Sequence, residues 1–174
     1  MNSDLVVRRA RLDDLQAIVE LRLALLREYR DHPLYEQLRP DAPARAYDLF
    51  RSQLTSPAEA MFIGEWNRTV IAVLRCVESG ASPLLLPDRY CYVSSVYVRP
   101  EHRRQGVLRA LLALAESWCE ERGLTEMRLH SSTASPVAID TWDALGFEVV
   151  EHVRRRTLTP AGHGARPHAH AESR

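Results

Sequence analysis

Tyr92-Val93-Ser94-Ser95-Val96-Tyr97-Val98, followed shortly by Arg103-Arg104-Gln105-Gly106-Val107-Leu108-Arg109, is the stretch that decides how this chain folds. Its first part is rich in β-branched and aromatic residues, which predicts a strand. The run after the second part, Ala110–Cys119, has apolar residues at helical spacing. The first N–H groups of a helix lack internal partners, and the helix dipole adds positive charge at that end. A strand, a basic turn with one glycine and a helix start therefore predict a site for a diphosphate-bearing ligand.

The composition indicates an ordinary globular protein without a dominant charge. The chain has 174 residues, of which 45% are hydrophobic and 26% are charged. Its 23 basic and 23 acidic side chains give a formal net charge of +0, which argues against a broad surface for nucleic acid or for an anionic membrane. We expect one domain over residues 1–158 and a loose C-terminal tail over 159–174, where periodicity ends.

The sequence also bears on localisation, on the state of the cysteines and on metal binding. No apolar run reaches transmembrane length, and the N-terminus has no signal-peptide pattern, so we expect a cytoplasmic protein. Cys76, Cys91 and Cys119 lie far apart in predicted strands and a helix, which favours free buried thiols over disulfides. The tail histidines lack a fourth ligand, so we expect no metal site.

Hydrophobic periodicity predicts the element order β-α-α-β-β-β-α-β-α-β. We expect strands at 5–11, 61–66, 69–77, 92–98, 125–130 and 147–153, and helices at 13–29, 43–54, 110–119 and 135–146. Consecutive strands in the middle of the chain favour antiparallel pairing. The strand–helix–strand unit around Gly106 should instead be parallel and right-handed.

This order and this turn resemble the GNAT superfamily of acyl-CoA-dependent N-acyltransferases, from about Leu5 to Val153. The superfamily's phosphate turn reads Gln/Arg-x-x-Gly-x-Gly/Ala. Arg103 and Gly106 match that pattern, whereas Leu108 stands at the last position.

The superfamily also carries a late helix of the form Asn-x-x-Ala, then Tyr, then Gly-Phe. Ala138 and Gly146-Phe147 match this pattern in place. Ser135 stands at the Asn position and Trp142 at the Tyr position, and both depart from it.

The resemblance implies a mixed α/β sheet whose fourth and fifth strands splay apart to hold the pantetheine arm of coenzyme A. An N–H group near Val96 would polarise the thioester carbonyl. The diphosphate would bind N–H groups from about Arg104 to Arg109. The cofactor-binding residues implied are Val96, Tyr97, Val98, Arg103, Arg104, Gln105, Gly106, Val107, Leu108, Arg109, Ser135, Ala138 and Trp142.

The function implied is an N-acetyltransferase that moves an acetyl group from acetyl-CoA, its co-substrate, to a primary amine of a small molecule or peptide. The amine would attack directly in a ternary complex, without a metal. The alternative is a non-catalytic acyl-CoA-binding sensor or interaction module, which the departures at Ser135 and Trp142 motivate. A homodimer that completes the sheet is a further expectation, because the last strand lacks the pair that such folds usually have.

The proton-transfer groups remain open, because the indole N–H of Trp142 is not acidic enough to protonate a thiolate. Water or a hydroxyl would supply that proton, and the hydroxyl candidates are Ser132, Thr133, Ser135 and Tyr92. His130, at the end of a predicted strand next to the splay, is the candidate base.

The acceptor pocket is expected at the first helix and the loop after it. The candidates there are Glu28, His32, Tyr35 and Glu36, which are otherwise surface groups. Arg75 stands alone in an apolar strand, where it would hold an acceptor carboxylate or serve as a paired structural residue.

Overall fold

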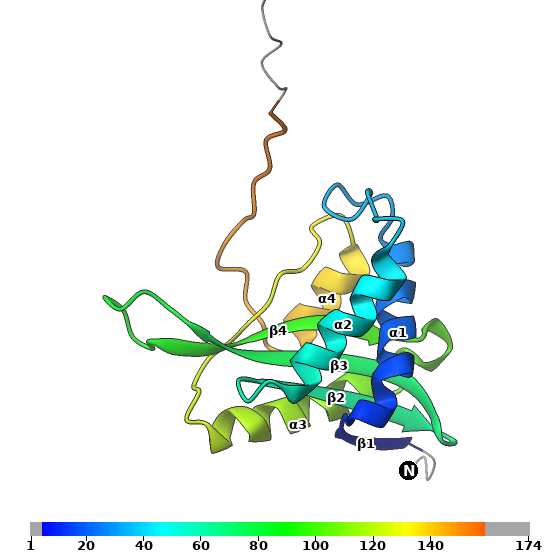
Figure 1. The fold of residues 1–174 in the computed structure, drawn as a ribbon. Coiled ribbons are helices and arrows are strands. Elements are labelled where there is room, and N and C mark those ends of the chain that lie inside the picture. Colours follow the sequence, from blue (N-terminus) through cyan, green and yellow to red (C-terminus); the bar gives the residue numbers. More distant parts are fainter. Residues whose placement is uncertain (1–4, 159–174) are drawn as a thin grey trace, which may run out of the picture.

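The computed structural model describes residues 5–158, which form a five-stranded mixed sheet with helices on both faces (Figure 1). The strands lie side by side in chain order: β1 (Leu5–Arg9), β2 (Glu59–Trp66), β3 (Thr69–Gly80), β4 (Arg89–Val98) and β5 (Met127–Arg128). All neighbours are antiparallel except β4 and β5, which are parallel. The predicted mixed sheet and the parallel unit around Gly106 are confirmed.

Two pairs of helices cover the sheet. Helices α1 (Leu15–Glu28) and α2 (Ala42–Thr55) pack on one face, and α3 (Val107–Glu121) packs on the other, on the side where α4 (Pro136–Ala144) also lies (Figure 1). Two short 3-10 turns, η1 (Leu12–Asp14) and η2 (Pro100–His102), precede α1 and the turn before α3. All four helices are where the sequence predicts them.

Each face of the sheet has its own apolar core. Ile18 and Leu21 of α1 are fully buried against the α1–α2 face, together with Ile63 of β2. Leu111 of α3 is fully buried on the opposite face. Burial of one such side chain stabilises the fold by about 1.5–3 kcal/mol, so these stripes fix the helices that carry the site.

The predicted last strand, 147–153, is wrong. Residues 147–158 form neither helix nor strand, and Val149, Val150 and Val153 are exposed. Their β-branched composition favours a strand only where a neighbouring strand offers an edge. The neighbour here is β5, which covers only two residues instead of the predicted 125–130, so too little edge is available.

The structure of residues 5–158 also bears on the expectations for the cysteines, for membrane-spanning segments and for metal sites. Cys76, Cys91 and Cys119 are buried free thiols. None of the helices in this range combines the length and apolar character that crossing a bilayer requires. The same residues bring no three metal-binding side chains together. The expected tail at 159–174 lies outside the described residues.

Gly64 controls how closely α3 approaches the sheet. A Cβ built there would lie 3.2 Å from Cγ1 of Val107 and 3.3 Å from the Cβ of Ala72. We expect Gly64→Leu to lower the free energy of unfolding by about 1–3 kcal/mol through overpacking, measured by urea denaturation. Gly80→Leu is the control, because nothing lies within 4 Å of its Cβ position. Equal losses in both variants would contradict this role.

Asp14 anchors the start of α1 through charge. It accepts hydrogen bonds at 2.8 Å from Arg8 and at 2.7 Å from the N–H of Arg11. The bond from Arg8 lowers the pKa of Asp14 below its ordinary 3.8. Its stabilising contribution is therefore complete above pH 4 and is lost as the pH falls through the lower, folded-state pKa.

We expect Asp14→Asn to cost about 2 kcal/mol of unfolding free energy at pH 7, because it removes a nearly buried charged hydrogen bond. The difference from the unsubstituted protein should shrink as the pH falls below about 4. Urea denaturation at several pH values measures this, with the exposed neighbour Asp13→Asn as control. A deficit that does not depend on pH would rule out the charge explanation.

Candidate active site

The turn between β4 and α3 leaves a row of backbone donors free. Gly106 precedes the first helical residue with φ of 81°, and Arg104 also has a positive φ, 58°. The first N–H of α3 with a helical partner belongs to Ala110, which donates to the carbonyl of Gly106 at 3.0 Å. Within residues 5–158, the N–H groups of 104–109 have no hydrogen-bond partner. This arrangement can bind an anion.

Gly106 suits this position for two reasons. Its left-handed backbone conformation is unfavourable for residues with a Cβ. In addition, nothing lies within 4 Å of the place where a Cβ would project. A ligand can therefore approach the backbone at this point.

Arg103, predicted to bind the cofactor, holds the turn in place. Its Nε donates to the carbonyl oxygen of Val98 at 2.9 Å, and Nη2 lies 2.7 Å from Oε2 of Glu28. The guanidinium also lies 5.5 Å from the ring centre of Tyr97. Arg103 thus connects the end of α1 to the end of β4, and Glu28, predicted to touch the acceptor, serves as its partner.

Strands β4 and β5 part almost immediately, as predicted. Their pairing covers only Cys91 with Met127 and Tyr92 with Arg128. Beyond Tyr92, β4 pairs only with β3 within the described range. A register shift against β3 and a left-handed φ of 52° at Ser95 mark a β-bulge, which bends a strand. The open edge of β4 therefore carries the predicted residues Val96, Tyr97 and Val98.

Tyr92 and His130 meet at the point where the two strands part. The Tyr92 hydroxyl oxygen lies 3.0 Å from Nδ1 of His130, and the rings are edge to face at 5.5 Å. A tyrosine hydroxyl is protonated at neutral pH, and burial raises the pKa of Tyr92 further. Sequence reasoning named these two residues separately as acid and base candidates, and the fold brings them into one hydrogen bond.

The remaining predicted groups of the late helix have local roles. The Ser135 hydroxyl accepts from the N–H of Ala138 at 3.3 Å and caps α4. The Ser132 hydroxyl accepts from the N–H of Ala134 at 3.2 Å. The Trp142 ring packs edge to face on Phe147 at 5.3 Å and against the α3 core.

The segment between α1 and α2 forms an aromatic group on the opposite face. The ring of His32 lies 5.0 Å from the Tyr35 ring, and the Tyr29 ring lies 6.2 Å from Tyr35. Arg155, from the segment after α4, lies 3.3 Å from a carboxylate oxygen of Glu36. The predicted acceptor residues His32, Tyr35 and Glu36 are thus neighbours, whereas Glu28 pairs with Arg103.

Arg75 has an internal partner. Its guanidinium lies 2.7 Å from Oε2 of Glu59 and 3.1 Å from the Ser94 hydroxyl. In register, Arg75 pairs with Ser94 on β4 and with Met61 on β2. Met61 belongs to the α1–α2 core, so Arg75, Ser94 and, two residues away, Tyr92 share that face.

Arg22 was missed by sequence reasoning. It lies on α1 four residues after Ile18 and three after Val19, both buried, so its helical position faces the sheet. The side chain is half-buried, and no hydrogen bond or ion pair is found for it within residues 5–158. The signal in the sequence is a basic residue at a core-facing position of the predicted helix.

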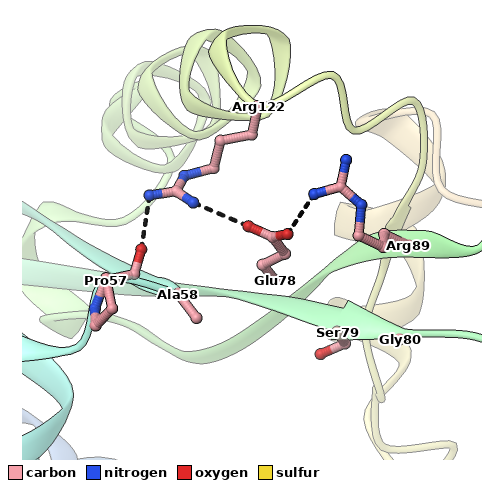
Figure 2. Close-up of a pocket in the computed structure, with 7 residues that line it drawn as sticks. All are labelled: Pro57, Ala58, Glu78, Ser79, Gly80, Arg89 and Arg122. Carbon is pink, nitrogen blue, oxygen red and sulfur yellow. Dashed lines mark hydrogen bonds and ion pairs between the residues drawn. The ribbon is translucent and has the colours of Figure 1, made fainter.

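The pocket in Figure 2 belongs to another part of the molecule. It has a volume of about 360 Å³ and is lined by Pro57, Ala58, Glu78, Ser79, Gly80, Arg89 and Arg122. Glu78 pairs with Arg89 at 2.5 Å and with Arg122 at 2.9 Å, so its charge is internally compensated. Arg122 follows the C-terminus of α3, about 24 Å along the helix from Gly106.

Known proteins share this sequence pattern and fold. Residues 18–147 match the model of the Acetyltransferase (GNAT) family. The chain is 24% identical over 104 residues to human N-acetyltransferase 8, a match that covers 58% of this chain and 44% of that protein. It is 31% identical over 62 residues to the aminoglycoside N(6')-acetyltransferase type 1 of Salmonella typhimurium, a match that covers 36% of this chain and 43% of the relative.

The matches therefore span less than half the length of these curated relatives. Among solved structures, the fold resembles a predicted acetyltransferase with acetyl-CoA from Clostridium acetobutylicum. The TM-score is 0.73 at 18% identity, and the match covers 91% of this chain and 99% of that one. The family match includes the open strand β4, the free N–H groups before α3 and the Tyr92–His130 pair, and on this evidence the chain belongs to the GNAT family of acetyltransferases.

Proposed function

We propose that this protein is an N-acetyltransferase that transfers an acetyl group from acetyl-CoA to a primary amine by direct attack in a ternary complex. The observation that carries the proposal is the open edge of β4, which runs from Tyr92 to Val98 between the Tyr92–His130 pair and the turn at Gly106. The proposed proton-transfer pair, the unpaired edge of β4 and the free N–H groups of 104–109, which we call the anion cradle, thus lie in this order from Tyr92 to the start of α3.

The cradle fits the diphosphate of coenzyme A. The free N–H groups of 104–109 offer several donors at a helix N-terminus, and the open space over Gly106 admits a bulky anion. The pantetheine arm would lie along Val96–Val98 and donate to or accept from the unpaired strand edge. An N–H near Val96 would bind the thioester oxygen as negative charge develops on it.

Tyr92 and His130 would carry out the two proton transfers of the reaction. The attacking amine must be neutral, and a histidine next to the gap can accept its proton directly or through water. The leaving thiolate needs a proton in return, and the hydroxyl of Tyr92, which is protonated at neutral pH, can donate one. The 3.0 Å contact between the two groups would let them act as one relay. Positioning of both substrates supplies much of the remaining acceleration.

The proposal includes a homodimer in which a second copy completes the sheet. Its support is the short β5 together with the exposed valines of the segment that follows α4, namely Val149, Val150 and Val153. Apolar, β-branched side chains beside a two-residue edge strand suit strand pairing with another chain.

Acetyl-CoA binding and turnover together test the proposed function. Isothermal titration should show binding at micromolar concentrations, and a panel of primary amines should release free thiol from acetyl-CoA. Absence of binding would reject the proposal. Binding without turnover of any amine would instead support a non-catalytic acyl-CoA sensor.

We expect Gly106→Asp to weaken acetyl-CoA binding by at least about tenfold, because a carboxylate would face the diphosphate and like charges repel by several kcal/mol. Titration calorimetry measures the change. Gly123→Asp is the matched control, since Gly123 also has a positive φ, 66°, and open space at its Cβ position but lies past the other end of α3. Full affinity in Gly106→Asp would place the ligand elsewhere.

We expect Tyr92→Phe and His130→Gln each to lower kcat by about a hundredfold, the usual scale of general acid–base catalysis, with acetyl-CoA affinity unchanged. The double variant should be little worse than either single one, because the two groups act as a unit. Tyr90→Phe on the same strand is the control, since Tyr90 stacks with Arg128 at 4.0 Å instead. Unchanged kcat in both single variants would remove the pair from the mechanism.

A further inference from the structure

Arg22 is a half-buried cation that the fold does not neutralise. Two other half-buried arginines have carboxylate partners: Arg8 pairs with Asp14 at 2.8 Å, and Arg75 with Glu59 at 2.7 Å. No such partner for Arg22 is found in the described part of the chain. Burial lowers the pKa of Arg22, yet an arginine stays charged at neutral pH. Partial burial of an uncompensated charge is unfavourable, which points to a ligand.

The surroundings of Arg22 add to this positive charge. Helix α1 packs on β3 and β4, and Arg75 of β3 and Tyr92 of β4 lie on the face of the sheet that α1 covers. Both groups are therefore close enough to act electrostatically on Arg22, as is the hydroxyl of Tyr35. Glu59 pairs with Arg75, and no carboxylate paired with Arg22 is found within residues 5–158. The carboxylates at the end of α1 and in the segment after it are engaged elsewhere, because Glu28 pairs with Arg103 and Glu36 with Arg155. The cluster therefore carries about one uncompensated positive charge.

This charge lies beside the proposed proton relay. Arg22 and Arg75 act on Tyr92, whose hydroxyl contacts His130 at the place where β4 and β5 part. Tyr35, one of the aromatic residues between α1 and α2, also lies close enough to Arg22 to act on it electrostatically. A small molecule with its amine at Tyr92 and His130 would therefore direct its other end toward Arg22.

We propose that Arg22, backed by Arg75, determines acceptor specificity by binding a carboxylate, so that the acceptor is a small primary amine that carries a carboxylate, such as an amino acid. The inference rests on the proposed acetyl transfer. A guanidinium pairs with a carboxylate through two parallel hydrogen bonds. Polycationic amines, the class to which aminoglycosides belong, would meet a like charge there. The acceptor thus differs from the one named for the Salmonella relative.

A matched amine panel tests the inference on the unsubstituted protein. The panel holds free amino acids, their carboxamides, dipeptides with a free carboxyl group, and an aminoglycoside. We expect kcat/KM for amino acids to exceed that for their carboxamides by about tenfold to a hundredfold, the scale of one charge-assisted hydrogen bond. Dipeptide turnover distinguishes a peptide C-terminus from a free amino acid as the source of the carboxylate. Equal turnover of acids and carboxamides, or preference for the aminoglycoside, would overturn it.

Substitutions then assign the preference to Arg22. Arg22→Gln should bring the acid-to-carboxamide ratio close to one by raising KM for the acid, and Arg22→Lys should restore part of it by returning the charge. Arg27→Gln, an exposed position on the same helix, should leave the ratio unchanged. A preference that survives in Arg22→Gln would contradict the role of this residue.

Binding measurements separate the failure of this inference from that of the proposed function. Titration of the CoA-saturated protein with an amino acid and with its carboxamide should show binding of the acid alone, whatever the turnover. If acetyl-CoA binds and amines are acetylated without a carboxylate preference, only the inference about Arg22 fails. If acetyl-CoA does not bind, the proposed function fails, and the inference fails with it.

Discussion

The site depends on one constraint, namely that β4 loses its neighbour after Tyr92. Two residue pairs join β4 to β5, and the bulge at Ser95 then bends β4 away from the regular register. An unpaired strand edge within a protein is unfavourable, because its N–H and C=O groups need partners. A ligand that lies along the edge supplies them. The Tyr92–His130 contact lies where the two strands part, so in the proposed reaction the same strand geometry would position both the ligand and the proton-transfer groups.

Arg103 fixes the position of the turn that follows β4, where the proposed anion cradle lies. Its contacts with Val98 and Glu28 fix the chain between the end of β4 and the start of α3. The packing of Val107 against Gly64 sets the distance of that helix start from the sheet. The backbone donors of this turn are therefore held in position by side chains whose contacts lie within the protein. This explains how Arg103 matches the phosphate motif although its guanidinium is engaged within the protein.

The sequence was informative where the determinants are local. The turn glycine and the helical periodicity predicted the four helices correctly, because each depends on residues close in the chain. The bulge at Ser95 and the length of β5 could not be predicted, since they depend on how distant strands share hydrogen bonds. Arg22 and Arg75 show the same limit. Their spacing is visible in the sequence, but the partner of Arg75 comes from a different strand, and the isolation of Arg22 becomes visible only in the fold.

A proposed ligand site made of backbone groups is compatible with a fold that is shared at low sequence identity. The likeness to the Clostridium acetobutylicum structure covers nearly the whole of both chains at 18% identity. Main-chain donors remain available under most substitutions that preserve the turn, so a site of this kind places few demands on the side chains there. On the α1–α2 face, the proposed recognition of the acceptor depends instead on the side chain of Arg22, and replacing it by a neutral residue would remove the preference for a carboxylate.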